Sequence, residues 1–98
     1  MMYVKIHQSE HTEIVAVCDE NLLGKTIKEG EKEIIISENF FKGELKKEKE
    51  VVEILKQSSN ANLIGNESVE CGLLAKIITE DNMLFCGGVK HAQFYSLE

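Results

Sequence analysis

The side chains best suited to chemistry in this sequence are a thiol and a carboxylate at the end of a predicted strand. Cys18 and Asp19 directly follow residues 14–17, whose β-branched side chains favour a strand buried on both faces. A thiol near the start of a helix has a lowered pKa, and His91 in the last predicted strand could activate it if the two strands are neighbours. The pattern is compatible with a small enzyme in which Asp19 or Gln93 orients His91. In the simpler interpretation, Cys18 is a buried packing residue, Asp19 caps a helix and His91 bonds to backbone.

Zinc prefers the same thiol and imidazole ligands, so a metal-assisted version of this site has to be considered. The candidate ligands are His7, His11, Cys18, Cys86 and His91. They lack the closely spaced pairs that mark a closed zinc site, and the spacing of the two N-terminal histidines falls in a connection rather than on a helix. We therefore expect no metal and no other cofactor.

A binding surface is the interpretation from another class. Cationic and aromatic side chains on one face of a sheet bind unpaired RNA. The side chains of this kind are Tyr3, Lys5, His7, Lys25, Lys28, Lys90, His91 and Tyr95. The net charge of −6 and the absence of arginine count against a dedicated phosphate site. Residues 65–68 could expose amides at a helix start, but a plain N-cap at Asn66 is the simpler interpretation.

The elements that position these residues are predicted to form an α+β domain, a mostly antiparallel sheet with one long amphipathic helix and two short helices. Alternation and β-branched runs predict strands at 2–7, 12–18, 25–28, 32–37, 61–65, 75–79, 83–86 and 89–95. The long helix is predicted over 46–57, where apolar residues fall on one face. The short helices begin after Asp19 and at Asn66 and are expected to end at Gly24 and Gly72. Three successive isoleucines at 34–36 favour a central place for their strand.

Size and composition indicate one domain over residues 1–96, and we interpret Leu97 and Glu98 as a cloning remnant. Three widely separated cysteines fit reduced thiols better than disulfides. The sequence has no secretory pattern and no apolar run near the roughly 20 residues that span a bilayer. We expect a cytoplasmic protein that does not bind membranes.

Five short motifs resemble the small archaeal proteins grouped as domain-of-unknown-function family 424. They lie at residues 3–7, 15–20, 22–25, 61–65 and 91–93, in the family's order and spacing. The family has no established activity, and the resemblance implies only an association with translation and RNA-related proteins. One departure is Lys90, where the family pattern has a proline.

Taken together, these observations favour a small non-enzymatic binding module with an RNA or protein partner, and a Cys18/His91 enzyme is the alternative. The sequence does not set the oligomeric state. The binding residues that we expect are Lys25, Asn62, Gly65, Asn66, His91 and Gln93.

Overall fold

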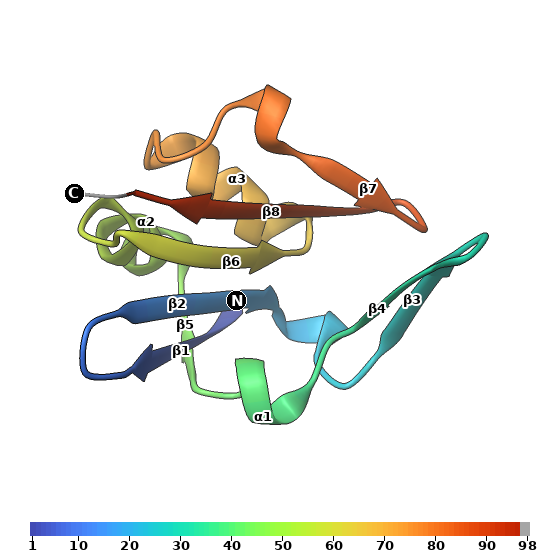
Figure 1. Ribbon diagram of the computed structural model, residues 1–98, viewed down its shortest axis with the longest axis horizontal. Helices are drawn as coiled ribbons and strands as arrows, with labels where there is room; N and C mark the ends of the chain where they lie inside the picture. Colours follow the sequence, from blue (N-terminus) through green and yellow to red (C-terminus); the bar gives the residue numbers. More distant parts are fainter. Residues whose placement is uncertain (97–98) are drawn as a thin grey trace.

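The computed structural model describes residues 1–96, and Leu97 and Glu98, the expected cloning remnant, lie outside the described residues. A six-stranded sheet in the order β5-β1-β2-β6-β8-β7 runs through the molecule (Figure 1). Its strands are β1 (Met2–Gln8), β2 (Glu13–Asp19), β5 (Glu44–Lys46), β6 (Asn60–Ile64), β7 (Leu84–Cys86) and β8 (Val89–Tyr95). The sheet is mixed, because β2 and β6 are parallel and every other neighbouring pair is antiparallel.

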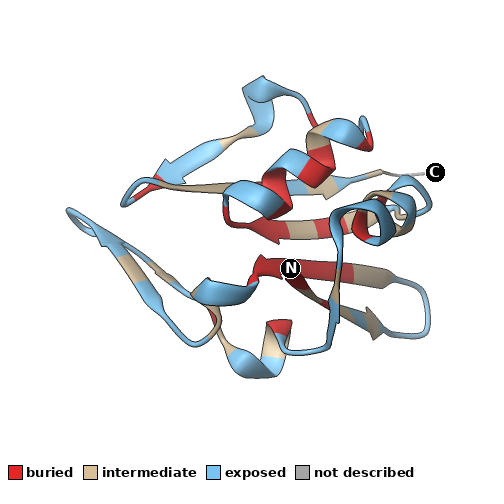
Figure 2. Cartoon of the chain, turned by 180° about the vertical axis from the view of Figure 1, so that it is seen from behind, coloured by how far each residue is buried: buried red, intermediate tan, exposed pale blue. Residues whose placement is uncertain are grey.

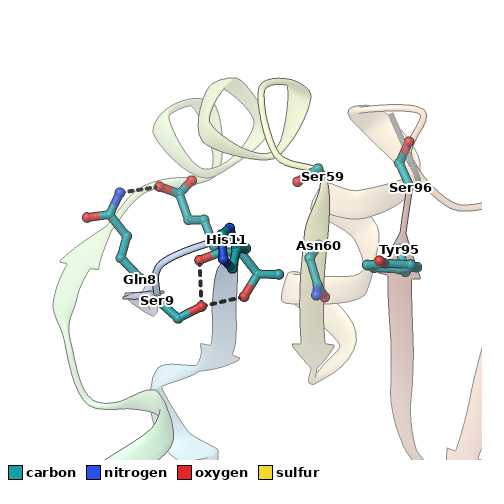
Figure 3. A pocket seen from close by; sticks show the side chains of 9 residues that line it. Gln8, Ser9, His11, Ser59, Asn60, Tyr95 and Ser96 are labelled. Carbon is teal, nitrogen blue, oxygen red and sulfur yellow. Dashed lines mark hydrogen bonds between the residues drawn. The ribbon is translucent and has the colours of Figure 1, made fainter.

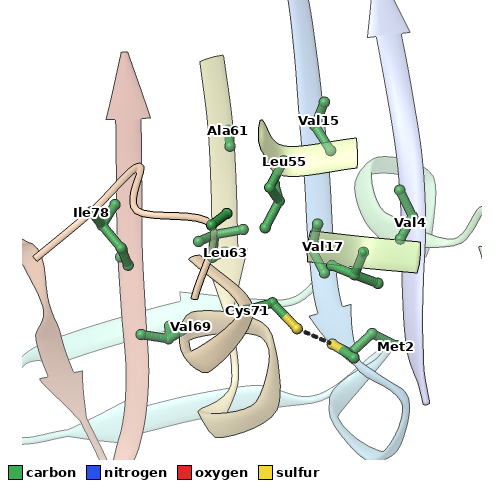
Figure 4. Packing of buried hydrophobic residues seen from close by; sticks show 13 residues of the cluster. Met2, Val4, Val15, Val17, Leu55, Ala61, Leu63, Val69, Cys71 and Ile78 are labelled. Atoms are coloured by element: carbon green, nitrogen blue, oxygen red, sulfur yellow. Dashed lines mark hydrogen bonds between the residues drawn. The ribbon is translucent and has the colours of Figure 1, made fainter. Parts of the chain in front are cut away.

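Two nine-residue helices, α2 (Glu48–Lys56) and α3 (Asn66–Leu74), pack on one face of this sheet. Both lie on the same side of the strands in Figure 2, where buried residues gather along β2, β6 and α3. The apolar side chains between these layers include Val17, Leu63 and Leu55, which are fully buried (Figure 4). This layer is the main core of the domain.

The opposite face of the sheet is only partly covered. The short helix α1 (Glu38–Phe41) and a hairpin of β3 (Thr26–Glu29) and β4 (Lys32–Ile35) lie over the end of the sheet that carries Cys18 and Ile64. This hairpin, which we call the arm, forms a separate two-stranded sheet and projects from the body of the molecule (Figure 1). Within residues 1–96, no helix or strand covers the other end of this face.

The α+β class and the mostly antiparallel sheet agree with the sequence analysis. Residues 1–96 contain three α-helices, as expected, but the helix predicted after Asp19 is the 3-10 turn η1 (Glu20–Leu22), and α1 was not predicted. The expectation of one long helix is not confirmed, because α2 is no longer than α3 and residues 44–46 form β5 instead. Gly72 does not end α3 but lies inside it, where a β-carbon would press against Leu63 and Ile78.

Two of the expected strands also differ from the structure. Residues 75–79 form no strand, and the turn before β7 is a short 3-10 helix, η2 (Glu80–Asn82). The isoleucine strand is not central: β4 lies in the arm, where Ile35 is 65% exposed, and Ile36 is buried just beyond the strand's end. In residues 1–96, no helix has the length and apolarity to cross a membrane.

Candidate functional site

Asp19 is the last residue of β2, and its carboxylate binds the start of α3. The Oδ1 atom accepts hydrogen bonds from the Ser68 amide (2.8 Å) and the Ser68 hydroxyl (2.7 Å), and Oδ2 accepts one from the Glu67 amide (3.1 Å). Helix starts leave amide donors unpaired, and a carboxylate there both accepts these bonds and meets the positive end of the helix dipole. Asp19 is therefore a cap, as in the simpler interpretation, but of a helix 48 residues further along the chain. It makes no side-chain cap bond to the 3-10 turn η1 (Glu20–Leu22) that directly follows it.

Cys18 lies in a sealed part of the fold. The residue has no exposed surface and packs in a cluster with Ile36, Phe41 and Ile64. Burial, with a smaller contribution from the neighbouring Asp19 charge, raises the pKa of its thiol to about 12. The expected lowering of this pKa is wrong, because burial removes the thiol from water, the Asp19 charge lies beside it, and the helix expected after Asp19 is only the three-residue turn η1.

Cys18 and His91 lie in one row across the sheet but do not touch. Cys18 pairs with Ile64 of β6, and Ile64 pairs with His91 of β8. The two residues are thus two strand spacings apart, roughly 10 Å, with an isoleucine side chain between them. Burial lowers the pKa of His91, which favours a neutral imidazole. The predicted adjacency of these two strands is wrong, because β6 lies between β2 and β8, and no Cys–His pair forms.

The candidate zinc ligands are also dispersed. No group of three or more His, Cys, Asp or Glu side chains with metal-binding geometry occurs among residues 1–96. The His7 ring stacks on Phe40 at 4.6 Å between centroids, and its Nε2 lies 2.8 Å from the Phe40 carbonyl oxygen. His7 thus has a structural role in docking α1 against β1.

The predicted binding residues fall into separate places. Gly65 and Asn66 lie at the start of α3, and Lys25 lies before β3 in the arm. The Asn66 Oδ1 accepts a bond from the Lys90 amide at 3.3 Å. A proline at position 90, as in the family pattern, would have no N–H to donate, so this contact is specific to a chain with another residue there. Lys25, Gly65 and Asn66 therefore do not form one surface with the other predicted binding residues, which are Asn62, His91 and Gln93.

Asn62 and Gln93 do come together, on the uncovered end of the sheet. They are register partners on β6 and β8. The Gly65 amide bonds to the Lys90 carbonyl (2.8 Å), and antiparallel pairs alternate from that point, so Asn62 and Gln93 form a non-hydrogen-bonded pair. Pairs of this type hold their side chains closest together. Neither amide side chain bonds to another group within residues 1–96, so both are available to a ligand.

A hollow of about 470 Å³ lies over this pair. It is lined by Ile14, Phe40, Asn60, Ala61, Asn62, Gln93, Phe94 and Tyr95. We call this surface the open face. Asn60 is the register partner of Tyr95, which is 64% exposed. The site therefore combines amides, which both donate and accept hydrogen bonds, with exposed aromatic surface.

A second hollow of about 560 Å³ continues from the open face at Asn60 and Tyr95. Figure 3 shows its polar lining from the β1–β2 connection, Ser59 and the end of β8. Ser9 bonds to the Thr12 hydroxyl at 2.7 Å, and Gln8 bonds to Glu13 at 3.0 Å, so this wall is held in place. The two hollows together make an extended polar groove.

Asn60 is the residue of this groove that sequence analysis missed. The signal for it is present, because Asn60 and Asn62 are two apart and therefore project from the same face of a strand. The predicted strand begins only at residue 61, since Asn60 closes a run of turn-forming residues, and the alternation is interrupted there.

Comparisons with known proteins agree with the fold. The family model described as "Protein of unknown function (DUF424)" matches residues 6–97. The chain is also similar to an uncharacterized conserved protein from Methanopyrus kandleri, known from its crystal structure, with a TM-score of 0.80 and 27% identity over 99% of this chain and 94% of that one. The search of curated proteins finds no match.

Proposed function

This chain belongs to DUF424, a family of proteins of unknown function, so its function is inferred from its own structure. We propose that it is a non-catalytic module of the cytoplasm that binds unpaired RNA on the open face. The single observation that carries the proposal is the amide pair Asn62–Gln93 beside the exposed ring of Tyr95. Amide side chains match the mixed donors and acceptors of a base edge, and an aromatic ring stacks on any base.

The hollow has a shape and chemistry suited to a base rather than to a phosphate. Its lining is amide and aromatic and contains no lysine. Unpaired RNA is recognised chiefly through splayed bases, which enter such surfaces and stack. The hydroxyls of Ser9, Thr12 and Ser59 in the adjoining hollow suit a ribose, which carries hydroxyls of its own.

The charge of the protein sets the expected mode of binding. With a net charge of −6, the chain gains no general attraction to a polyanion. Lys5, which shares a row of the sheet with Ala16 and Asn62, is the nearest cation by register, and its ammonium group donates to the Asn39 carbonyl at 2.7 Å. Neutralising one or two phosphates gives a salt slope of only about −1, so stacking and base contacts must supply most of the affinity.

The enzyme alternative has no specific observation in its favour. A thiol without exposed surface and with a pKa of about 12 is almost entirely protonated at neutral pH. His91 is separated from it by Ile64, and the Asp19 oxygens are occupied by the start of α3. We therefore do not propose catalysis at Cys18.

The test is binding of short unpaired RNA, measured by fluorescence anisotropy at low ionic strength. Tyr95→Ala should weaken binding by about 10-fold or more, because stacking contributes about 1–3 kcal/mol per base. Tyr95→Phe keeps the ring and should bind almost as the parent does. Gln93→Ala should also weaken binding, and Gln57→Ala, which removes an exposed amide at the end of α2, is the matched control.

Saturable binding that follows this order supports the proposal. Absence of binding at low salt would overturn it. Binding that is indifferent to Tyr95 and Gln93 would also overturn it, because the ligand would then be held elsewhere.

A further inference from the structure

The two edges of the six-stranded sheet differ in chemistry. The edge strand β5 carries Glu44 and Lys46, and charges of this kind discourage pairing with a further strand. The other edge strand, β7, consists of Leu84, Phe85 and Cys86 and carries no charge. An edge without charges is a template on which another strand can pair.

The backbone of Phe85 faces outward from this edge. Lys90, its register partner on β8, points its carbonyl oxygen toward β6, where it accepts the Gly65 amide. The pair Phe85–Lys90 is therefore a non-hydrogen-bonded pair, and the N–H and C=O of Phe85 point away from β8. The Gly87–Gly88 turn, with both φ angles positive, fits the same alternation because a two-residue turn closes on a hydrogen-bonded pair.

A mainly apolar groove of about 330 Å³ lies beside this edge, between β7 and the arm (Figure 1). It is lined by Lys32, Glu33, Ile34, Leu84, Phe85, Cys86 and His91. Leu84 is 62% exposed and Phe85 is 52% exposed. Leu84 projects from the face of the sheet that carries Cys86 and His91, toward the arm, and Phe85 projects from the opposite face, so this edge exposes large apolar side chains on both sides.

The groove is preformed because the arm is docked on the β7–β8 turn. The Gly87 amide donates to Glu29 Oε1 at 2.9 Å, and the Cys86 thiol approaches the Ile27 carbonyl oxygen at 3.8 Å. A β-carbon on Gly87 would lie 2.9 Å from Ile27 Cγ2, so the glycine permits this close approach. Ligand binding would therefore not require the residues that line the groove to become ordered.

The groove is lined by one cation and one carboxylate, and the cation is available to an acidic group of a ligand. Glu33 is paired with Lys28 across the arm at 3.7 Å. Lys32 is exposed and has no ion pair within the part of the chain that the structure describes. A carboxylate on the ligand would complement this free ammonium group.

We propose that β7 and this groove bind an extended peptide segment of a partner protein, which adds to the sheet as a strand beside β7. Its backbone pairs with the N–H and C=O of Phe85, alternate apolar side chains enter the groove against Leu84 and Ile34, and an acidic side chain meets Lys32. Main-chain pairing supplies affinity in such strand additions, and the alternate side-chain pockets supply specificity. This surface is separate from the open face, so the inference does not depend on RNA binding.

The probe is a displayed library of random peptides selected on the full-length protein, followed by synthesis of the enriched peptides. We expect a motif with apolar residues at every second position and an acidic residue. Binding of the synthetic peptide should weaken about 10-fold with Leu84→Asp, which places a charge in the groove. Leu74→Asp, at an exposed leucine of α3, is the matched control.

Lys32→Glu should weaken binding about threefold and select against the acidic residue, whereas Lys49→Glu on the exposed side of α2 should not. In amide exchange, the Phe85 N–H should become protected when the peptide is bound. Failure to enrich peptides, or enriched peptides that bind Leu84→Asp unchanged, would overturn the proposal. A concentration-dependent dimer that Leu84→Asp abolishes would also overturn it, because the occupant would then be a second copy of this chain.

Discussion

The carboxylate of Asp19 occupies the space in which a β-carbon of Gly65 would stand. An added β-carbon there would overlap Asp19 Cγ and both carboxylate oxygens. Gly65 also has a φ of +112°, a backbone conformation that glycine adopts without a steric penalty. The end of β2 and the start of α3 can therefore meet only because one residue lacks a side chain where the other places its carboxylate.

Replacement of Gly65 with alanine should be strongly destabilising. The backbone conformation of Gly65 (φ +112°, ψ 154°) is essentially restricted to glycine and costs another residue about 1–3 kcal/mol. The overlap with Asp19 adds a similar amount, so we expect a loss of about 3 kcal/mol or more in the free energy of unfolding. Urea denaturation monitored by circular dichroism measures this loss. Gly88→Ala is the matched control: Gly88 has a φ of +78° with open space around it, so only the backbone term of about 1 kcal/mol applies. Equal losses at the two sites would contradict the proposed overlap.

Asp19 itself should matter more for stability than its size suggests. Asp19→Ala leaves the two amides and the Ser68 hydroxyl without their acceptor, and we expect a loss of about 3 kcal/mol in the free energy of unfolding. Asp19→Asn keeps one oxygen but turns an NH₂ group toward a backbone donor, and it should cost about half as much. Equilibrium unfolding in urea distinguishes the two variants. If alanine and asparagine cost the same small amount, the carboxylate is not the cap that holds α3.

Stability should fall as the pH rises above about 9. Burial raises the pKa values of the Cys18 and Cys71 thiols to about 12. Between their ordinary pKa and this raised value the unfolded chain loses the protons while the folded chain keeps them, so unfolding is favoured as the pH increases. Each thiol should contribute about 1.4 kcal/mol per pH unit in this window and nothing below it.

Unfolding curves of the parent and of Cys18→Ala, recorded at several pH values from neutral to alkaline, isolate one thiol from the other groups that titrate there. The variant should lose stability less steeply by about 1.4 kcal/mol per pH unit. Parallel pH dependences would show that the Cys18 thiol ionises in the folded protein. Rapid alkylation of Cys18 at neutral pH would show independently that the thiol is accessible and ionised, and it would reopen the enzyme alternative.

Local sequence patterns predict a strand best where its bounds depend on local signals alone and not on which distant segment covers it. The prediction for β8 has the observed bounds, Val89–Tyr95, because the Gly87–Gly88 turn marks its start and residues 91–95 alternate between polar and apolar side chains. The prediction for the isoleucines at 34–36 is wrong because an apolar run does not say which neighbour covers it; Ile36 is buried against the sheet while Ile35 is exposed on the arm. Gly72 has the residue type of a helix end, whereas the close approach of Leu63 is what requires a glycine there.

The candidate site could be predicted only in part, because its key contacts join distant segments. That Asp19 caps a helix is evident from its type and position, but its partner lies 49 residues away at Ser68. The register that brings Asn62 opposite Gln93, or that places Ile64 between Cys18 and His91, depends on strand order. No local pattern encodes that order, so the sequence cannot show that an isoleucine separates the thiol from the imidazole.

Lys90 offers a test of how β8 joins the start of α3. The Lys90 amide donates to Asn66 Oδ1, and both groups are near the surface, so Lys90→Pro should cost only about 1 kcal/mol in the free energy of unfolding. Ala92→Pro is the contrasting variant. Ala92 is buried, and by the alternation set at Gly65 its amide bonds within the β6–β8 ladder, so proline there should cost about 3 kcal/mol or more. Urea denaturation compares the two; a loss at Lys90 as large as that at Ala92 would mean that the Lys90–Asn66 bond, and not the strand ladder, fixes this corner of the fold.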